Sequence, residues 1–110
     1  MNPSLYKRGN LWHAAEAPTI GEHFQELARI GFTQIERIVS SDLPSRETYD
    51  QPQTEWVALL RGEALLEIEG EPLQLRSGDY LLLPAHTRHR VLETTRDALW
   101  LAVHVSGSRP

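Results

Sequence analysis

Two short stretches of the chain carry residues whose types and spacing could support chemistry. In the stretch from Gly78 to His89, a glycine turn leads into an apolar run, a proline ends that run, and the histidine follows five residues later. In the other stretch, Glu55 directly precedes the apolar run 56–60, and a glycine follows two residues after it. A carboxylate and an imidazole that share one enclosed space could bind a divalent metal ion, move a proton or orient a small ligand.

Such a pair needs strands to position it, and the rest of the pattern is that of short strands. Residues 63–69 alternate strictly, with Ala64, Leu66 and Ile68 on one face and three glutamates on the other. This alternation is typical of a strand with one buried face, so we expect the glutamates in solvent. Turns rich in glycine or proline separate about seven or eight such segments, which predicts an all-β sandwich or barrel.

We expect three parts along the chain. Residues 1–31 form an N-terminal arm with a short helical turn within 21–30, where apolar residues recur at helical spacing before a glycine. Residues 32–105 form the barrel, and residues 106–110 form a frayed tail. The fold is therefore predicted to contain at most one short helix.

The arm also carries apolar side chains that need cover, at Leu5, Tyr6, Leu11 and Trp12. A small open barrel leaves strand edges unpaired, and edges of this kind favour association. We therefore expect a homodimer.

The composition excludes several classes of function. The chain has 11 basic and 15 acidic residues, a net charge of −4, and no cluster of Lys or Arg, so nucleic acid and anionic membranes are poor partners. It has no cysteine, which excludes disulfides, thiolate catalysis and zinc–thiolate sites. No apolar run is long enough to span a bilayer, and the first twenty residues lack the pattern of a signal peptide. We expect a cytoplasmic protein.

The two stretches together resemble the two motifs of the cupin superfamily. Glu55 and Gly62 match the second half of the first motif, and Gly78, Pro84 and His89 match the second motif, spacing included. The resemblance extends over residues 32–105, and the segment before Glu55 is similar to short bacterial single-domain cupins of unassigned role. It implies a double-stranded β-helix, or jelly-roll barrel.

The chain also departs from these motifs. A typical cupin holds its metal with three histidines and a glutamate. Aligned on Glu55, the two histidines of the first motif fall at Tyr49 and Gln51. In the second motif, His86 stands where glycine is usual and Glu93 stands at an asparagine position.

The resemblance therefore implies a reduced set of metal ligands. Gln51, Glu55 and His89 could supply an amide oxygen, a carboxylate and an imidazole, with the phenol of Tyr49 as a fourth group. Such a set would hold Fe, Mn, Ni or Zn weakly, because neutral oxygens are poorer donors than imidazole. The alternative is that Glu55 and His89 bond each other, or a water, inside a metal-free barrel.

Four further residues are candidates for binding a substrate: Trp56, Tyr80, His86 and His104. The two aromatic residues could line an apolar pocket, and the histidines could point into it. Each has a plainer alternative, namely core packing for the aromatic residues, a turn position for His86 and a core or interface position for His104. We interpret Trp100 as a core residue, and Glu36 and Arg37 as an ordinary surface pair on a strand.

Three functions remain open on this sequence. The first is an enzyme that uses a divalent metal to act on a small organic molecule, with Tyr49 or His86 moving a proton. The second is a metal-free module that binds or senses a small ligand, oriented by Gln51, Glu55 and His89. The third is a structural role in which the barrel dimerises. The sequence assigns no reaction.

Overall fold

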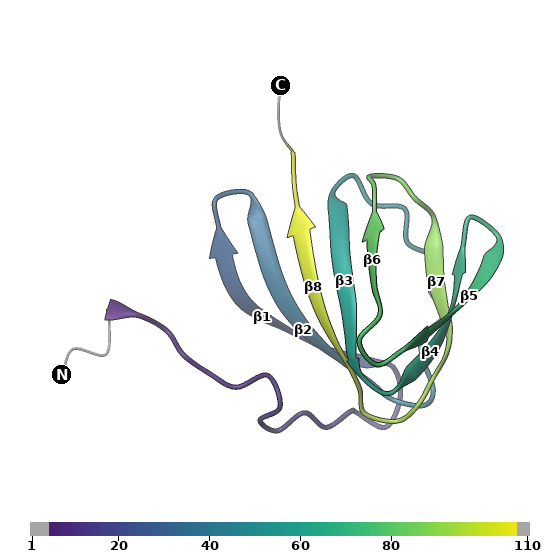
Figure 1. Cartoon of the computed structure of the whole chain (residues 1–110), viewed down its shortest axis with the longest axis horizontal. Helices are drawn as coiled ribbons and strands as arrows, with labels where there is room; N and C mark the ends of the chain where they lie inside the picture. The colour runs from purple at the N-terminus through teal and green to yellow at the C-terminus, as the bar shows by residue number, and fades with distance from the viewer. Residues whose placement is uncertain (1–4, 108–110) are drawn as a thin grey trace.

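The computed structural model describes residues 5–107, and these form an all-β fold of two antiparallel sheets (Figure 1). The all-β prediction is therefore confirmed. Within those residues no helix is long and apolar enough to cross a membrane. The strands are β1 (Glu22–Ile30), β2 (Thr33–Ser40), β3 (Thr54–Arg61), β4 (Glu63–Ile68), β5 (Glu71–Arg76), β6 (Tyr80–Leu83), β7 (His89–Thr94) and β8 (Ala98–Val105).

The strand order is that of a jelly roll, in which neighbours along the chain often lie in different sheets. One sheet has the order β1-β2-β8-β3-β6, and the other has the order β5-β4-β7. The chain crosses from β3 to β4 at Gly62, so the two sheets face each other across one core. The strands that carry Glu55 and His89, β3 and β7, belong to opposite sheets, and their side chains can meet between them.

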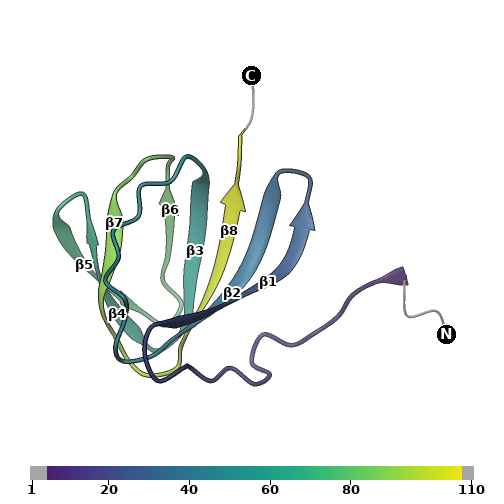
Figure 2. The same cartoon turned by 180° about the vertical axis from the view of Figure 1, so that it is seen from behind.

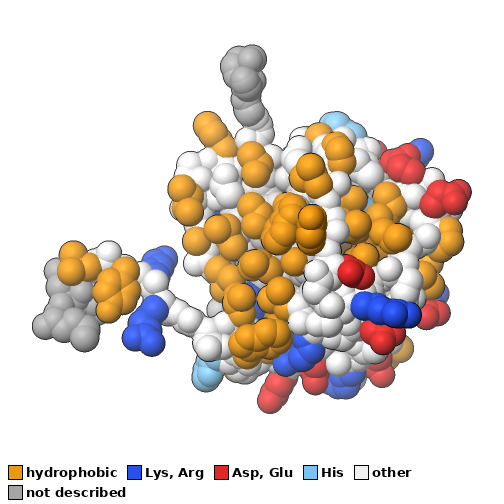
Figure 3. Space-filling model, viewed as in Figure 1, with side chains coloured by type: hydrophobic (Ala, Val, Ile, Leu, Met, Phe, Trp, Pro, Cys, Tyr) orange, Lys and Arg blue, Asp and Glu red, His pale blue; other side chains and the backbone are white. Residues whose placement is uncertain are grey.

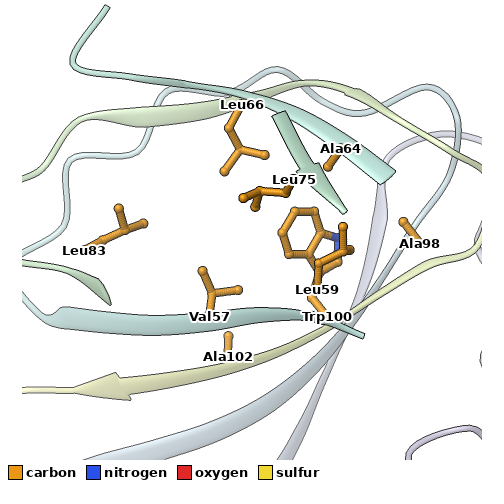
Figure 4. Close-up of a cluster of buried hydrophobic side chains, with 9 residues drawn as sticks. All are labelled: Val57, Leu59, Ala64, Leu66, Leu75, Leu83, Ala98, Trp100 and Ala102. Carbon is orange, nitrogen blue, oxygen red and sulfur yellow. The ribbon is translucent and has the colours of Figure 1, made fainter. Parts of the chain in front are cut away.

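The core fills one part of the space between the sheets. Figure 4 shows Leu66 and Leu75 of the smaller sheet pointing toward Val57 and Ala102 of the larger one. Trp100 is 5% exposed within this cluster and donates its indole N–H to Ser40 Oγ at 3.0 Å. Burying apolar side chains of this size contributes about 1.5–3 kcal/mol each, which makes the cluster the main support of the fold.

The prediction of a helical turn within 21–30 is wrong, because this segment is strand β1. It pairs with β2 in the larger sheet, and the register shifts between Glu26 and Ala28. A shift of this kind breaks the strict alternation of side chains, so Phe24, Leu27 and Ala28 recur at a spacing that resembles a helix. The sheet therefore begins at Glu22.

The arm runs along the outer face of the larger sheet and then extends away from the barrel (Figures 1 and 2). Arg37 projects outward and donates to the backbone carbonyls of Leu11 and His13, at 2.9 and 2.6 Å. Arg61 donates to the carbonyl of Ala15 at 2.6 Å, and Ala15 packs on buried apolar residues of this outer face. Two arginines of the sheet therefore fix the path of the arm.

Candidate ligand-binding cavity

A cavity of about 120 Å³ lies between the sheets and opens beside the loop that precedes β3. Alternation along each strand decides which side chains face it. Most of its wall is apolar, formed by Phe24, Ile38, Val57, Leu66, Leu83, Val91 and Trp100. Its ionisable and hydrogen-bonding side chains include Glu36, Tyr49, Gln51, Glu55, His89 and His104. Mostly apolar walls with a few polar groups are typical of small-molecule sites.

The structure brings Glu55 and His89 together in this cavity. Glu55 is 8% exposed, and its Oε1 atom lies 3.6 Å from Nε2 of His89. That distance is too long for a strong hydrogen bond, so the interaction is mainly one of charge. Gln51 donates a hydrogen bond from its Nε2–H to the same Oε1 of Glu55 at 2.9 Å, and this bond holds the carboxylate in place.

The ring of His89 is fixed from its other side. Its Nδ1 atom lies 2.8 Å from the carbonyl oxygen of Thr87, which requires Nδ1 to carry a proton. Burial disfavours the charged form, but the Glu55 carboxylate and the Thr87 carbonyl outweigh burial and raise the pKa of His89 above 6.5. His89 is therefore held in an orientation that directs Nε2 toward Glu55.

Tyr49 packs against the ring of His89, with the ring centroids 5.6 Å apart. The two residues also exchange backbone hydrogen bonds, at 2.8 and 3.1 Å. Burial and the nearby charges of Glu47 and Glu22 raise the pKa of Tyr49 above its usual 10.0. At neutral pH Tyr49 is therefore a neutral phenol.

A second pair of Glu and His faces the cavity, and the sequence did not reveal it. His104 Nε2 lies 2.9 Å from Glu36 Oε1, and the two side chains are 10% and 14% exposed. The interpretation of Glu36 and Arg37 as a surface pair is wrong, because they point to opposite faces of β2 and Arg37 is 7% exposed beneath the arm. The alternation of Glu36, Ile38 and Ser40 is the signal that could have placed Glu36 inside.

The two pairs are neighbours. Strand β8 lies between β2 and β3, so His104 is flanked by Glu36 on one side and is in register with Glu55 on the other. The hydrogen bond to Glu36 raises the pKa of His104 above 6.5, against burial and with support from the charge of Glu55. Its Nδ1 atom is buried and has no hydrogen-bond partner among residues 5–107.

Three of the candidate substrate-binding residues do not reach the cavity. Trp56 follows Glu55 on β3 and therefore points to the outer face, where its ring lies 5.7 Å from that of Tyr80. Tyr80 is 65% exposed on this outer face. His86 lies in an exposed turn with a φ of 63° and bonds Asp50 at 2.9 Å. These three residues do not line the cavity, whereas His104 does, and a role for any of the four in binding a substrate stays a prediction.

The donor atoms do not form a conventional metal centre. Among residues 5–107, no group of three or more Asp, Glu or His is positioned to hold an ion together. Gln51 presents its amide nitrogen to Glu55, and that nitrogen is not a metal ligand. Tyr49 is a neutral phenol, which is a weak donor. Only Glu55 and His89 of the expected set present suitable atoms to one another, which is fewer than the three protein ligands a metal centre usually has.

The model of the cupin domain matches residues 42–104 of this chain. The crystal structure of a "putative mannose-6-phosphate isomerase" from Ralstonia eutropha superposes with a TM-score of 0.80. It is 40% identical, and the match covers 93% of this chain and 100% of that one. No protein among those with curated descriptions matches the chain.

Two more distant structures share the fold. A cupin superfamily protein from Desulfitobacterium hafniense has a TM-score of 0.75 and is 23% identical, over 84% of each chain. A conserved protein of unknown function from Streptococcus pyogenes has a TM-score of 0.77 and is 18% identical, over 94% of this chain and 90% of its own. These likenesses support the jelly-roll architecture.

Proposed function

Because this chain belongs to the cupin family, whose model and a 40% identical structure both match it, we propose that its cavity binds a small organic molecule without a resident metal ion. The observation that carries the proposal is the group of Gln51, Glu55 and His89 in the cavity wall, where Gln51 is hydrogen-bonded to Glu55 and His89 faces the same carboxylate at 3.6 Å. The hydrogen bonds to Gln51 and to the Thr87 carbonyl hold Glu55 and His89 in place, so the two side chains are prepared to orient a ligand by hydrogen bonds.

The size of the cavity limits the ligand. A volume of about 120 Å³ is close to that of engineered cavities of about 150 Å³ that bind benzene. A ligand of that scale fits between the sheets, and a larger molecule would extend out through the mouth beside Glu47 and Ser45. The proposal therefore concerns compact molecules or the compact end of a longer one.

A fragment screen by protein NMR tests this function. We expect at least one compact organic fragment to shift the signals of residues around Glu55, His89 and His104 in a saturable manner. Filling the cavity with Val91→Phe should lower the affinity for that fragment by tenfold or more. The matched variant Leu92→Phe, at the next residue of the same strand, which does not line the cavity, should leave binding unchanged. A screen without any saturable shift would contradict the proposal.

A weakly bound divalent metal is the second candidate, favoured by one observation. His89 bonds Thr87 through Nδ1, so its Nε2 atom faces Glu55 and together they present two donors to one point. Such a pair would hold Fe, Mn, Ni or Zn, and the bound ion would supply Lewis-acid chemistry to a ligand in the cavity.

Elemental analysis separates the two candidates. The protein is loaded with each metal in turn, desalted and measured beside Glu55→Ala and His89→Ala. The metal-free proposal predicts well under one ion per chain in all three proteins. About one ion per chain in the wild type, lost in both variants, would contradict the metal-free proposal and support the weak metal site.

A further inference from the structure

The cavity is markedly acidic for one that must accept a small molecule. Four carboxylates line it: Glu22, Glu36, Glu47 and Glu55. Among the described residues that form its wall, none is Lys or Arg, and only His89 and His104 can carry positive charge. With both histidines protonated, two negative charges remain, and with both neutral, four remain. In either state the wall favours a cation and repels an anion.

Within residues 5–107, Glu22 and Glu47 form no ion pair, unlike Glu36 and Glu55. Glu22 accepts a hydrogen bond from the backbone N–H of Ser45 at 3.2 Å. Glu47 lies close enough to Tyr49 for its charge to raise the pKa of that phenol, as does Glu22. These two glutamates therefore place negative charge beside the opening through which a ligand enters.

Aromatic rings in the cavity wall also favour an organic cation. Phe24, Tyr49 and Trp100 all line the cavity. The face of an aromatic ring attracts a cation within about 6 Å, and desolvation strengthens that attraction. Carboxylates and aromatic faces in one mostly apolar cavity are complementary to an ammonium group that carries alkyl substituents.

A separate observation concerns His104, which has a buried ring nitrogen without a hydrogen-bond partner among the described residues. The side chain of His104 is 10% exposed and lines the cavity, yet its Nδ1 atom has no hydrogen-bond partner in the described part of the chain. In the neutral ring, whose Nε2 donates to Glu36, Nδ1 is an acceptor. A ligand with an N–H or O–H donor would satisfy it.

We propose that the cavity selects a small organic cation, an amine or quaternary ammonium compound of about six to eight non-hydrogen atoms, and discriminates against phosphorylated sugars. The inference rests on the proposed binding function and names its class of ligand. A sugar phosphate carries about two negative charges at neutral pH, which four lining glutamates would repel. It is also larger than the enclosed volume, whereas a compact ammonium compound fits within it.

Three probes test this selectivity by calorimetry at low ionic strength. Choline is the cation, 3,3-dimethylbutan-1-ol is its uncharged isostere, and mannose 6-phosphate is the anion. We expect choline to bind about tenfold or more tightly than the alcohol, and the phosphate to bind more weakly than either. Glu47→Gln should lower the affinity for choline by about fivefold and leave the affinity for the alcohol unchanged. Glu63→Gln, on the exposed face of β4, is the matched control and should change neither.

Each other outcome overturns the inference in a recognisable way. Equal affinity for choline and its isostere would show that charge is not selected, while the binding function would stand. Tighter binding of the phosphate would reverse the proposed ligand class. If none of the three probes binds, the inference falls, and the fragment screen described above then decides separately whether the cavity binds any small molecule.

Discussion

The imidazole of His104 and the carboxylate of Glu36 meet across two neighbouring strands, with Nε2 and Oε1 2.9 Å apart in the wall of the cavity. Glu55 on β3 and His89 on β7 also face this ring, and their charges have opposite effects on it. The pair is therefore part of one group of four ionisable side chains contributed by four strands.

The first prediction concerns the pH dependence of stability. The pKa of His104 is raised in the folded state, mainly by its hydrogen bond to Glu36. The stability contributed by this pair is therefore fully present below the unfolded-state pKa of about 6.5 and is lost as pH rises through the raised value. Glu36→Gln should cost about 1–3 kcal/mol at pH 6 and less at pH 9, as measured by urea unfolding.

The exposed substitution Glu63→Gln is the control for Glu36→Gln and should have little effect at either pH. NMR titration of the imidazole signals gives a second readout, because Glu36→Gln should lower the pKa of His104. A cost that is the same at both pH values, with an unchanged pKa of His104, would contradict this account.

The second prediction concerns the turn between β3 and β4. Gly62 has a φ of +93°, and a Cβ atom there would overlap Oγ1 of Thr95 and lie 3.2 Å from Ala98. Thr95 cannot move freely, because its Oγ1 accepts the backbone N–H of Glu63 at 3.0 Å. Gly62→Ala should therefore destabilise the fold by about 3 kcal/mol, from backbone strain and the lost contact together.

Gly70 is the matched comparison for Gly62. It also has a positive φ, +83°, but a Cβ atom there meets nothing within 4 Å. Gly70→Ala should cost only the backbone strain, about 1–2 kcal/mol. Thermal unfolding of the two variants beside the wild type measures the difference, and equal costs would show that the close approach to Thr95 is unimportant.

Much of the cavity could be predicted from the sequence because strand alternation and turn residues act locally. The strict alternation over residues 63–69 gave the correct inner face of β4, where Ala64 and Leu66 are buried. The spacing of Glu55 and of His89 from their glycines placed each residue in a short strand, β3 or β7, that faces the interior. The contact between the two follows from the fold that these motifs imply.

The missed features depend on which strands become neighbours, or on alternation that was not carried through. Trp56 follows Glu55 directly, so placing both in the pocket contradicts the period of two along a strand. The pairing of Glu36 with His104 depends on β2 lying beside β8, two strands about 60 residues apart in the chain. No local pattern specifies that contact.

The third prediction concerns the arm. Arg37 is 7% exposed and donates to two arm carbonyls, those of Leu11 and His13. Hydrogen bonds from a charged donor contribute about 1.5–3 kcal/mol. Arg37→Met keeps the apolar stem but removes these bonds, so the amide hydrogens of His13 and Ala17 should exchange about tenfold faster or more.

Arg29→Met serves as the control for the arm, because Arg29 is exposed on β1 and forms its ion pair with Glu26 of the same strand. Hydrogen exchange followed by NMR should show no change at the arm amides in this variant. Unchanged exchange in Arg37→Met as well would mean that the arginine does not hold the arm.

The fourth prediction concerns assembly. We propose that two copies of the chain pack through the outer face of their larger sheets. Figure 3 shows hydrophobic side chains gathered over this sheet. On β3 and β6, Trp56 packs against Tyr80, and Tyr80 and Leu82 are 65% and 62% exposed. Monomeric proteins rarely expose apolar side chains of this size together, which favours an interface.

A second copy suits this surface better than a charged partner. The chain has a net charge of −4, so two copies repel each other unless they meet through an uncharged face. The aromatic and aliphatic side chains on β3 and β6 provide such a face, and a twofold axis would place it against itself. Light scattering should therefore give twice the 12.5 kDa mass of one chain.

Leu82→Glu tests the interface directly, because it buries a charge against its own symmetry mate. This variant should dissociate to a monomer, with the β-sheet signal in circular dichroism unchanged. Leu73→Glu is the matched control, since Leu73 is 37% exposed but lies on β5 in the smaller sheet. It should remain a dimer. A monomeric wild type, or a dimer that survives Leu82→Glu, would show that the apolar face has another role.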